Sequence, residues 1–330
     1  MKHSDPMQRP PGLILIAGAP RSGTTWLAKI IDSHPDVLYR HEPDDRHPAP
    51  SPLLISDAPD LMRRWAADRS VKTNGKRPFF RKSCQPSWQR GLRNLIAGGI
   101  TVSARLPWPL RLAASLPVPD MAIGSAERVA IKSVRLGADA AVIARALPQC
   151  RVVFILRHPC GQVASVMRGS REGRFDLKTR GSAMPLDEVG AIRFASGFGV
   201  SEAAFRRLPD AAKYAWSWRA QNEPAYAALS GLQNVHVLAY EDLCADTDTQ
   251  VQRLLAFCGL DWTAQTQDFV ARSSARDGSA GYYGVFRNAV AAAGKWRDTM
   301  AQADQDAVHA VVAGSPLARF WPDLDQMITR

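Results

Sequence analysis

The chain has 330 residues, 46% of them apolar, and its 42 Lys and Arg exceed its 31 Asp and Glu to give a net charge of +11. The apolar share is ordinary for a globular protein with a real core. No run of about 18 apolar residues is present, which excludes a membrane-spanning helix. None of the five cysteines lies in a C-x-x-C pair, so the usual sign of a zinc site is missing. The positive charge indicates an anionic partner such as a nucleotide, a nucleic acid, an acidic glycan or a membrane surface, or it serves solubility alone.

The chain also has features that predict a cytoplasmic protein. The apolar stretch LILIA (13–17) is too short for the h-region of a signal peptide and continues directly into a glycine loop. An odd number of scattered cysteines suits reduced thiols.

The first element expected along the chain is a buried parallel strand in PGLILIAGAP (11–20), which ends in a glycine turn. A helix follows in TTWLAKIIDSHP (24–35), where Pro35 terminates it. Further strand patterns lie at 36–43, 127–134, 151–156 and 234–241, and helical patterns lie at 137–147, 159–168, 210–229 and 246–258. This alternation predicts an α/β fold with a parallel sheet and helices on both faces. We therefore expect a single P-loop-like, three-layer domain over residues 1–330.

Two segments fit the alternation poorly. The stretch from Arg69 to Arg111 contains ten Lys and Arg but no Asp or Glu, interleaved with tryptophan and proline. The stretch 168–209 is rich in Gly, Arg and Ser. We interpret both as insertions over the site, a basic one at about 69–120 and a flexible one at about 168–209.

The segment GAPRSGTTWL (18–27) resembles a phosphate-binding loop in which Thr24 stands where a P-loop has its lysine. A strand, a glycine turn and a helix N-terminus present backbone N–H groups and a positive dipole to an anion. Ser22, Thr24 and Thr25 add hydroxyl groups, and Arg21 adds a guanidinium. The loop therefore predicts an anion site even without the lysine.

A second motif, RHPCGQVASVMRGS (157–170), follows the most apolar later strand. Arg157 stands at the strand end, where an NTPase or kinase has a magnesium-binding carboxylate, and Ser165 lies in the following helix. We expect the two to hold a second phosphate and the site to work without a metal. Since ligands of parallel sheets bind at the carboxyl ends of strands, the glycine loop, Glu42, Lys132 and Arg157 are expected to meet there.

These motifs together resemble the sulfotransferase family that uses 3′-phosphoadenylyl sulfate (PAPS). PRSGTTW is similar to that family's loop for the 5′-phosphosulfate, and LRHPCGQVASVMRG is similar to its 3′-phosphate motif. VLAYEDLCADTDTQVQRLLAFCGL (237–260) resembles the family's strand-YEDL-helix segment, and FRNAVAAAGKWRDTM (286–300) resembles its C-terminal cap. The resemblance covers most of the chain, with the segments in the family's order.

The resemblance implies PAPS as donor, 3′-phosphoadenosine 5′-phosphate (PAP) as product, and a role for each matching residue. The 5′-phosphosulfate would be held by Arg21, Gly23, Thr24 and Thr25, with Ser22 in the same loop. Arg157 and Ser165 would bind the 3′-phosphate, while Trp26 and Tyr240 would lie at the adenine. The cap would comprise Arg287, Gly294, Lys295 and Trp296, although Asn288 and Ala289 depart from the family's basic run. Lys132 would assist the transferring sulfuryl group.

The catalytic base distinguishes two branches of the family. Relatives that act on phenols and steroids have a histidine two residues after the lysine matched to Lys132, and this chain has Val134 there. SHPDVLYRHEP (33–43) resembles the branch acting on saccharides or protein tyrosine, in which a glutamate, here Glu42, is the base. Because successive strand side chains face opposite ways, His41 is expected to point away from the site.

We therefore expect a hydroxyl acceptor, most plausibly a carbohydrate or a glycolipid. The basic segment 69–111 would bind an anionic glycan, rest on an anionic membrane surface, or serve only as a solvated lid. Tyrosine in a protein and a small-molecule alcohol stay open as acceptors. A P-loop kinase, a nucleic-acid-binding protein and a non-catalytic nucleotide binder are the alternatives. The first lacks a magnesium ligand, and the second leaves the glycine loop without a purpose.

Overall fold

The structure is a computed structural model that describes residues 12–103, 128–173, 187–274 and 289–324. These residues form a five-stranded parallel sheet with the order β2-β3-β1-β4-β5. The strands are β1 (Gly12–Ala17), β2 (Val37–His41), β3 (Arg128–Ser133), β4 (Arg151–Leu156) and β5 (Val235–Ala239). All five were predicted, but the last is shorter than expected because Tyr240 begins a helix.

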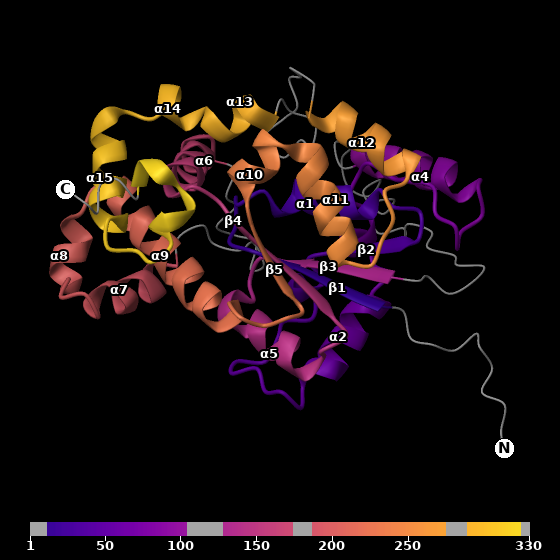
Figure 1. The fold of residues 1–330 in the computed structure, drawn as a ribbon, viewed down its shortest axis with the longest axis horizontal. Coiled ribbons are helices and arrows are strands. Elements are labelled where there is room, and N and C mark those ends of the chain that lie inside the picture. The colour runs from indigo at the N-terminus through magenta and orange to yellow at the C-terminus, as the bar shows by residue number, and fades with distance from the viewer. Residues whose placement is uncertain (1–11, 104–127, 174–186, 275–288, 325–330) are drawn as a thin grey trace.

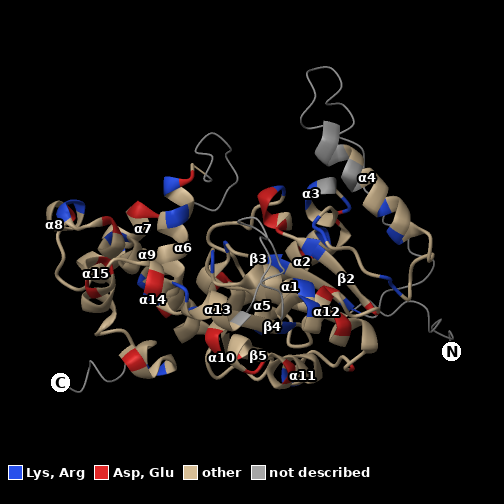
Figure 2. Cartoon of the chain, turned by 90° about the horizontal axis from the view of Figure 1, so that it is seen from above, with Lys and Arg blue, Asp and Glu red and all other residues tan. Residues whose placement is uncertain are grey.

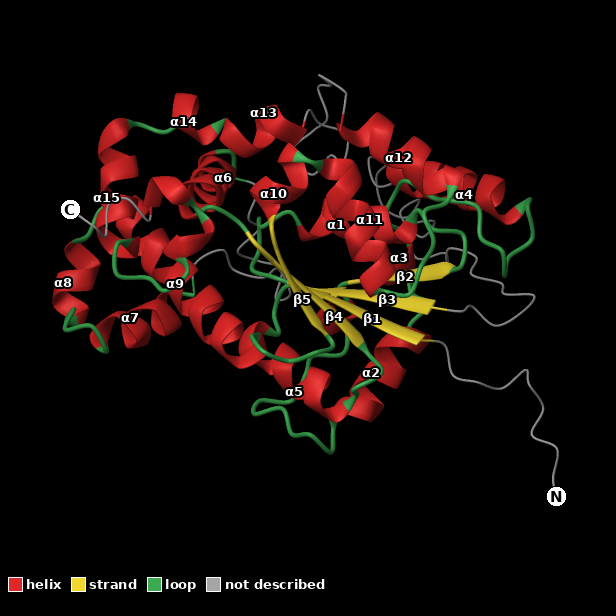
Figure 3. Cartoon of the chain, in the orientation of Figure 1, coloured by secondary structure: helices red, strands yellow, loops and turns green. Residues whose placement is uncertain are grey.

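Helices cover both faces of the sheet, as the alternation of elements predicted (Figure 3). In β1 the side chains of Ile14 and Ile16 join the core with α1 (Thr24–Asp32), α11 (Thr247–Phe257) and α12 (Ala264–Ser274). Leu15 and Ala17 join the opposite core with α2 (Ala58–Ala67), α5 (Ala140–Ala146) and α6 (Pro159–Arg171). Alternate strand residues thus enter different apolar layers, which explains why the strands are continuous apolar runs. The three-layer α/β fold is confirmed.

A group of helices lies at one end of the sheet, to the left in Figure 1. It is built around α9 (Asp210–Leu229), against which α7 (Glu188–Ser196) and α15 (Gln302–Val312) pack. Helix α8 (Glu202–Arg207) follows α7 and buries Phe205 beside Trp216 of α9. The segment expected as a flexible insertion therefore contains helices with a small core of their own. Its Gly-, Arg- and Ser-rich sequence hid the few apolar side chains that dock it.

The basic segment contains two helices among its described residues, α3 (Val71–Asn74) and α4 (Gln89–Ser103). Figure 2 shows Lys and Arg along them and no Asp or Glu. The segment packs through α3 beside β2, at the edge of the sheet. No helix among the described residues is both long and apolar enough to cross a membrane.

The register of the strands brings their carboxyl ends into line. Ala17 pairs with Ser133 and with Phe154, and Leu156 pairs with Ala239. His41 pairs with Lys132 one residue before the end of β3. The residues that follow these positions therefore share one edge of the sheet, where the sequence placed its candidate site.

Candidate active site

The loop between β1 and α1 has an unusual backbone. Arg21 has φ 71° and Gly23 has φ 97°, and Gly23 is the N-cap of α1. Glycine is required at 23, because an added Cβ would lie 2.5 Å from the ring of Tyr240. A left-handed arginine costs energy and is typical of functional loops. The first N–H groups of α1, which have no partner within the helix, open into this loop.

Arg21 joins the two motifs predicted to bind separate phosphates. Its Nε donates to Ser165 Oγ at 3.1 Å, and its carbonyl accepts from Arg157 Nη1 at 3.0 Å. The Arg157 guanidinium also lies over the Tyr240 ring, 4.8 Å from its centroid. The structure therefore places Arg21, Arg157, Ser165 and Tyr240 in one contiguous site.

The end of β4 is held by residues to which the sequence analysis gave no role. The carbonyl of Arg157 accepts from Trp218 Nε1 at 3.0 Å. Both carboxylate oxygens of Glu241 accept from His158 N at 3.2 Å, and one also accepts from Trp321 Nε1 at 2.9 Å. These contacts fix the backbone that carries the Arg157 guanidinium. The position of Glu241 within YEDL was the only sequence signal for them, and it did not specify the partners.

Glu42 and Lys132 form an ion pair at the neighbouring strand ends. The Lys132 side chain is 3% exposed and the Glu42 side chain 25% exposed, so the pair has access to solvent through its carboxylate. Burial alone would raise the pKa of Glu42, but attraction to Lys132 outweighs it and lowers that pKa to about 2. The predicted base and the predicted sulfuryl-binding lysine are therefore in direct contact, and Glu42 is ionised at neutral pH.

The expectation that His41 points away from Glu42 was wrong. Strand β2 ends at His41, and Glu42 has φ 46° and ψ 56°, so the alternation of an extended backbone does not apply to it. His41 lies close enough to Glu42 and Lys132 to interact with both charges, and its Nδ1 is 2.8 Å from the Tyr39 hydroxyl. Burial, with Lys132 adding to it, holds the pKa of His41 well below its ordinary value. His41 is therefore a neutral neighbour of the pair.

The other residues expected at the nucleotide are partly in the core. Trp26 is buried, donates from Nε1 to Ser273 Oγ at 3.0 Å and meets the edge of Tyr240. Trp296 is also buried and stacks on His158 at 4.5 Å. Its neighbours differ, since Gly294 ends α13 (Ala289–Gly294) and Lys295 is an exposed N-cap of α14 (Trp296–Thr299). Arg287 lies outside the described residues.

The C-terminal segment nonetheless reaches the site through its backbone. The carbonyl of Ala292 in α13 accepts from Arg157 Nη2 at 3.4 Å. Among the residues that the structure describes, no group of three or more His, Cys, Asp or Glu could hold a metal ion.

A sequence profile of the sulfotransferase family matches residues 11–264 of the chain, from the first strand through the YEDL segment. The chain belongs to the sulfotransferase family. The family and the class of enzyme inferred from the motifs are thus confirmed. No curated protein sequence matches this sulfotransferase.

Solved structures similar to this sulfotransferase include three from the same family by name or ligand. Mouse sulfotransferase SULT7A1, complexed with PAP, is 14% identical, with 95% of this chain and 88% of that chain covered at a TM-score of 0.44. The sulfotransferase domain of the Synechococcus PCC 7002 olefin synthase is 16% identical, covering 94% and 98% at 0.41. Retinol dehydratase with androsterone and inactive cofactor PAP is 16% identical, covering 93% and 81% at 0.38.

Replacing Glu241 by alanine should destabilise this sulfotransferase. The change leaves the His158 N–H and the Trp321 indole N–H without their acceptor, at a cost of about 1–3 kcal/mol. Urea unfolding measures the loss. Glu241→Gln keeps an acceptor oxygen and should lose less, and Asp242→Ala, at an exposed neighbouring position, serves as control. Equal losses for Glu241→Ala and Asp242→Ala would show that these contacts contribute nothing.

Proposed function

We propose that this sulfotransferase transfers a sulfuryl group from PAPS to the hydroxyl of a carbohydrate or glycolipid, with Glu42 as the base. The observation that carries the proposal is the contact of Glu42 with Lys132 at the sheet edge where Arg21 joins Arg157 and Ser165. A base, a sulfuryl-binding cation and two phosphate motifs then lie along one line of strand ends.

The site fits an anionic nucleotide. Ser22 Oγ and Arg157 Nε are buried and have no hydrogen-bond partner within the described part of the chain. Buried polar groups are rarely left in this state, and phosphate oxygens are suitable acceptors for both. Gly23 keeps the loop open for an anion, since any larger residue would collide with Tyr240. Arg21, Ser22, Thr24 and Thr25 would hold the 5′ end, and Arg157 with Ser165 the 3′-phosphate.

Each catalytic residue has a role that follows from its position. PAPS supplies the activated sulfuryl group. Glu42 accepts the proton of the attacking hydroxyl as the new O–S bond forms, and Arg21 with Thr24 neutralises charge on the departing phosphate as the old S–O bond breaks. Lys132 lowers the energy of negative charge on the sulfuryl oxygens. Once Lys132 turns toward those oxygens, Glu42 loses its attraction and becomes a stronger base, since its burial raises its pKa.

The acceptor is proposed from the base and from the basic segment. A glutamate at 42 and Val134 in place of a histidine favour the saccharide and tyrosine branch over the phenol branch. The basic segment attracts acidic glycans, and its exposed Trp88 and Leu95 suit a glycolipid at a membrane surface. We expect the reaction to take place in the cytoplasm.

The test is transfer of labelled sulfate from PAPS to a panel of saccharides, glycolipids, tyrosine peptides and simple alcohols. Saccharides or glycolipids should be the best acceptors, and Glu42→Gln should lower turnover about a hundredfold or more. Binding of PAP to Glu42→Gln, measured by calorimetry, should stay unchanged. Preference for tyrosine peptides or alcohols would replace the acceptor. Tight binding of magnesium ATP with none of PAP would replace the sulfotransferase activity with that of a kinase.

A further inference from the structure

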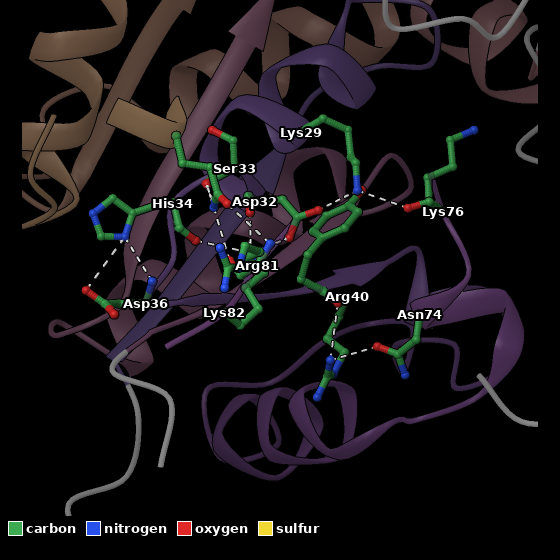
Figure 4. A network of polar contacts seen from close by, with 12 residues as sticks. Lys29, Asp32, Ser33, His34, Asp36, Arg40, Asn74, Lys76, Arg81 and Lys82 are labelled. Carbon is green, nitrogen blue, oxygen red and sulfur yellow. Dashed lines mark hydrogen bonds and ion pairs between the residues drawn. The ribbon is translucent and has the colours of Figure 1, made fainter. Parts of the chain in front are cut away.

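Lys76 belongs to the basic segment, far in sequence from every motif of the site, yet its backbone is fixed beside the site. Its carbonyl accepts from Lys29 Nζ at 2.9 Å, and Lys29 lies on α1, the helix that the glycine loop begins. Just before it, the side-chain oxygen of Asn74 accepts from Arg40 Nη1 at 2.7 Å. The Asn74 carbonyl accepts from Arg93 Nη2 at 2.8 Å. Lys76 is therefore held from both α1 and β2 (Figure 4).

The anchor of this segment is a buried cluster of charges. Asp32 of α1 forms ion pairs with Lys29 and with Lys82, which lies six residues beyond Lys76. All three side chains are at most 7% exposed. Lys82 also donates to the carbonyl of His34 at 3.1 Å, which ties the segment to the end of α1. Such contacts on both sides of Lys76 leave its backbone little freedom.

The side chain of Lys76 extends away from this anchor in Figure 4. Its half-buried ammonium interacts with the charges of Lys132, Glu42 and Arg21. Burial, followed by repulsion from Lys132, lowers the pKa of Lys76, while Glu42 acts in the opposite direction. The ammonium thus lies within reach of the base, the sulfuryl-binding lysine and the first phosphate loop.

We propose that Lys76 is a donor-binding residue of this sulfotransferase, whose ammonium contacts the terminal sulfuryl group of PAPS from the side opposite the glycine loop. The inference rests on the proposed function and extends it, since it gives one residue of the basic segment a place in the site. The physical argument is charge balance. Arg21, Lys132 and Lys76 outnumber the single carboxylate of Glu42, and a phosphosulfate carries a negative charge on each of its two groups. An anion at this place relieves the repulsion among the three cations.

The acceptor is a less suitable partner for Lys76. An acceptor hydroxyl must approach Glu42, and a neutral hydroxyl gains little from a third cation. The sulfuryl oxygens stay negatively charged throughout the transfer, so they benefit from Lys76 before and during it.

The experiment compares PAPS with PAP, which lacks the sulfuryl group, by calorimetry in the absence of acceptor. Lys76→Met should weaken binding of PAPS about tenfold, the effect of one charge-assisted contact, and change binding of PAP little. Lys76→Arg keeps the charge and should restore most of the PAPS affinity. Lys72→Met is the matched control, because Lys72 lies in the same segment but is half exposed and pairs with Asp45.

The outcomes separate this inference from the proposed function. If wild type binds neither PAPS nor PAP, the proposed function fails. If wild type binds both and Lys76→Met weakens neither, or weakens both equally, the sulfuryl contact of Lys76 is refuted while the proposed function stands. An equal loss of PAPS affinity in Lys72→Met would also refute it, since segment charge alone would then explain the effect.

Discussion

Replacing Arg157 by alanine should weaken the binding of PAP by about 3 kcal/mol, or roughly a hundredfold. The Arg157 guanidinium is positioned before any ligand arrives, because it donates to the carbonyls of Arg21 and Ala292 and lies over Tyr240. A fixed arginine loses little freedom on binding a phosphate and can meet it with two N–H groups. Calorimetry on the intact protein, without added metal, measures the change.

Two further variants make this result specific. Arg157→Lys keeps the charge but cannot form two parallel hydrogen bonds, so its affinity should lie between wild type and alanine. Arg272→Ala removes a half-exposed arginine that pairs with Asp268 on α12, and it should bind PAP like wild type. Unfolding by urea must show that Arg157→Ala is folded. If folded Arg157→Ala binds PAP as tightly as wild type, Arg157 is not a nucleotide ligand.

Replacing Asp32 by asparagine should destabilise the fold by about 3–5 kcal/mol, as expected when a buried charge loses its partner. Asp32 is the shared anion of Lys29 and Lys82 (Figure 4), and the substitution leaves both ammonium groups buried without it. Burial, which Asp32 opposes, already lowers the pKa of Lys29 to about 8, so this lysine has little further capacity to remain charged. Urea unfolding at neutral pH measures the difference.

The pH dependence provides a second readout for Asp32. Burial alone would raise its pKa, but the two lysines outweigh it and hold that pKa below the ordinary value of 3.8. A carboxyl group with a lowered folded pKa contributes stability above its unfolded pKa and loses it as the pH falls through the folded value. The gap between wild type and Asp32→Asn should therefore narrow in acid.

Asp268→Asn is the matched control for Asp32→Asn. It removes an exposed carboxylate that pairs with Arg272 within one helix, and such pairs contribute about 0–1 kcal/mol. If Asp32→Asn costs no more than Asp268→Asn, the buried cluster does not anchor the basic segment.

The sequence alone determined the framework of this protein. Continuous apolar runs predicted all five strands, because strands buried on both faces need apolar residues at successive positions. The glycine loop and Arg157 could be found because each follows such a strand directly, and parallel strands place their carboxyl ends at one edge. Local patterns sufficed wherever local sequence and overall fold agreed.

Tertiary structure alone decided how the side chains meet. The left-handed backbone of Glu42 brings it against Lys132, whereas strand alternation predicted the wrong relation to His41. Glu241 and Trp218 brace Arg157 across large gaps in the sequence, and no periodic pattern encodes such contacts.

The basic segment shows the same limit most clearly. By composition it was a charged insertion, because a run of lysine and arginine is usually solvated. The fold instead buries Lys82 against Asp32 and fixes Lys76 beside the base. Whether a charged side chain is buried depends on a counter-charge that the fold supplies from elsewhere in the chain, so composition determined the sign of the charge and tertiary structure determined its location.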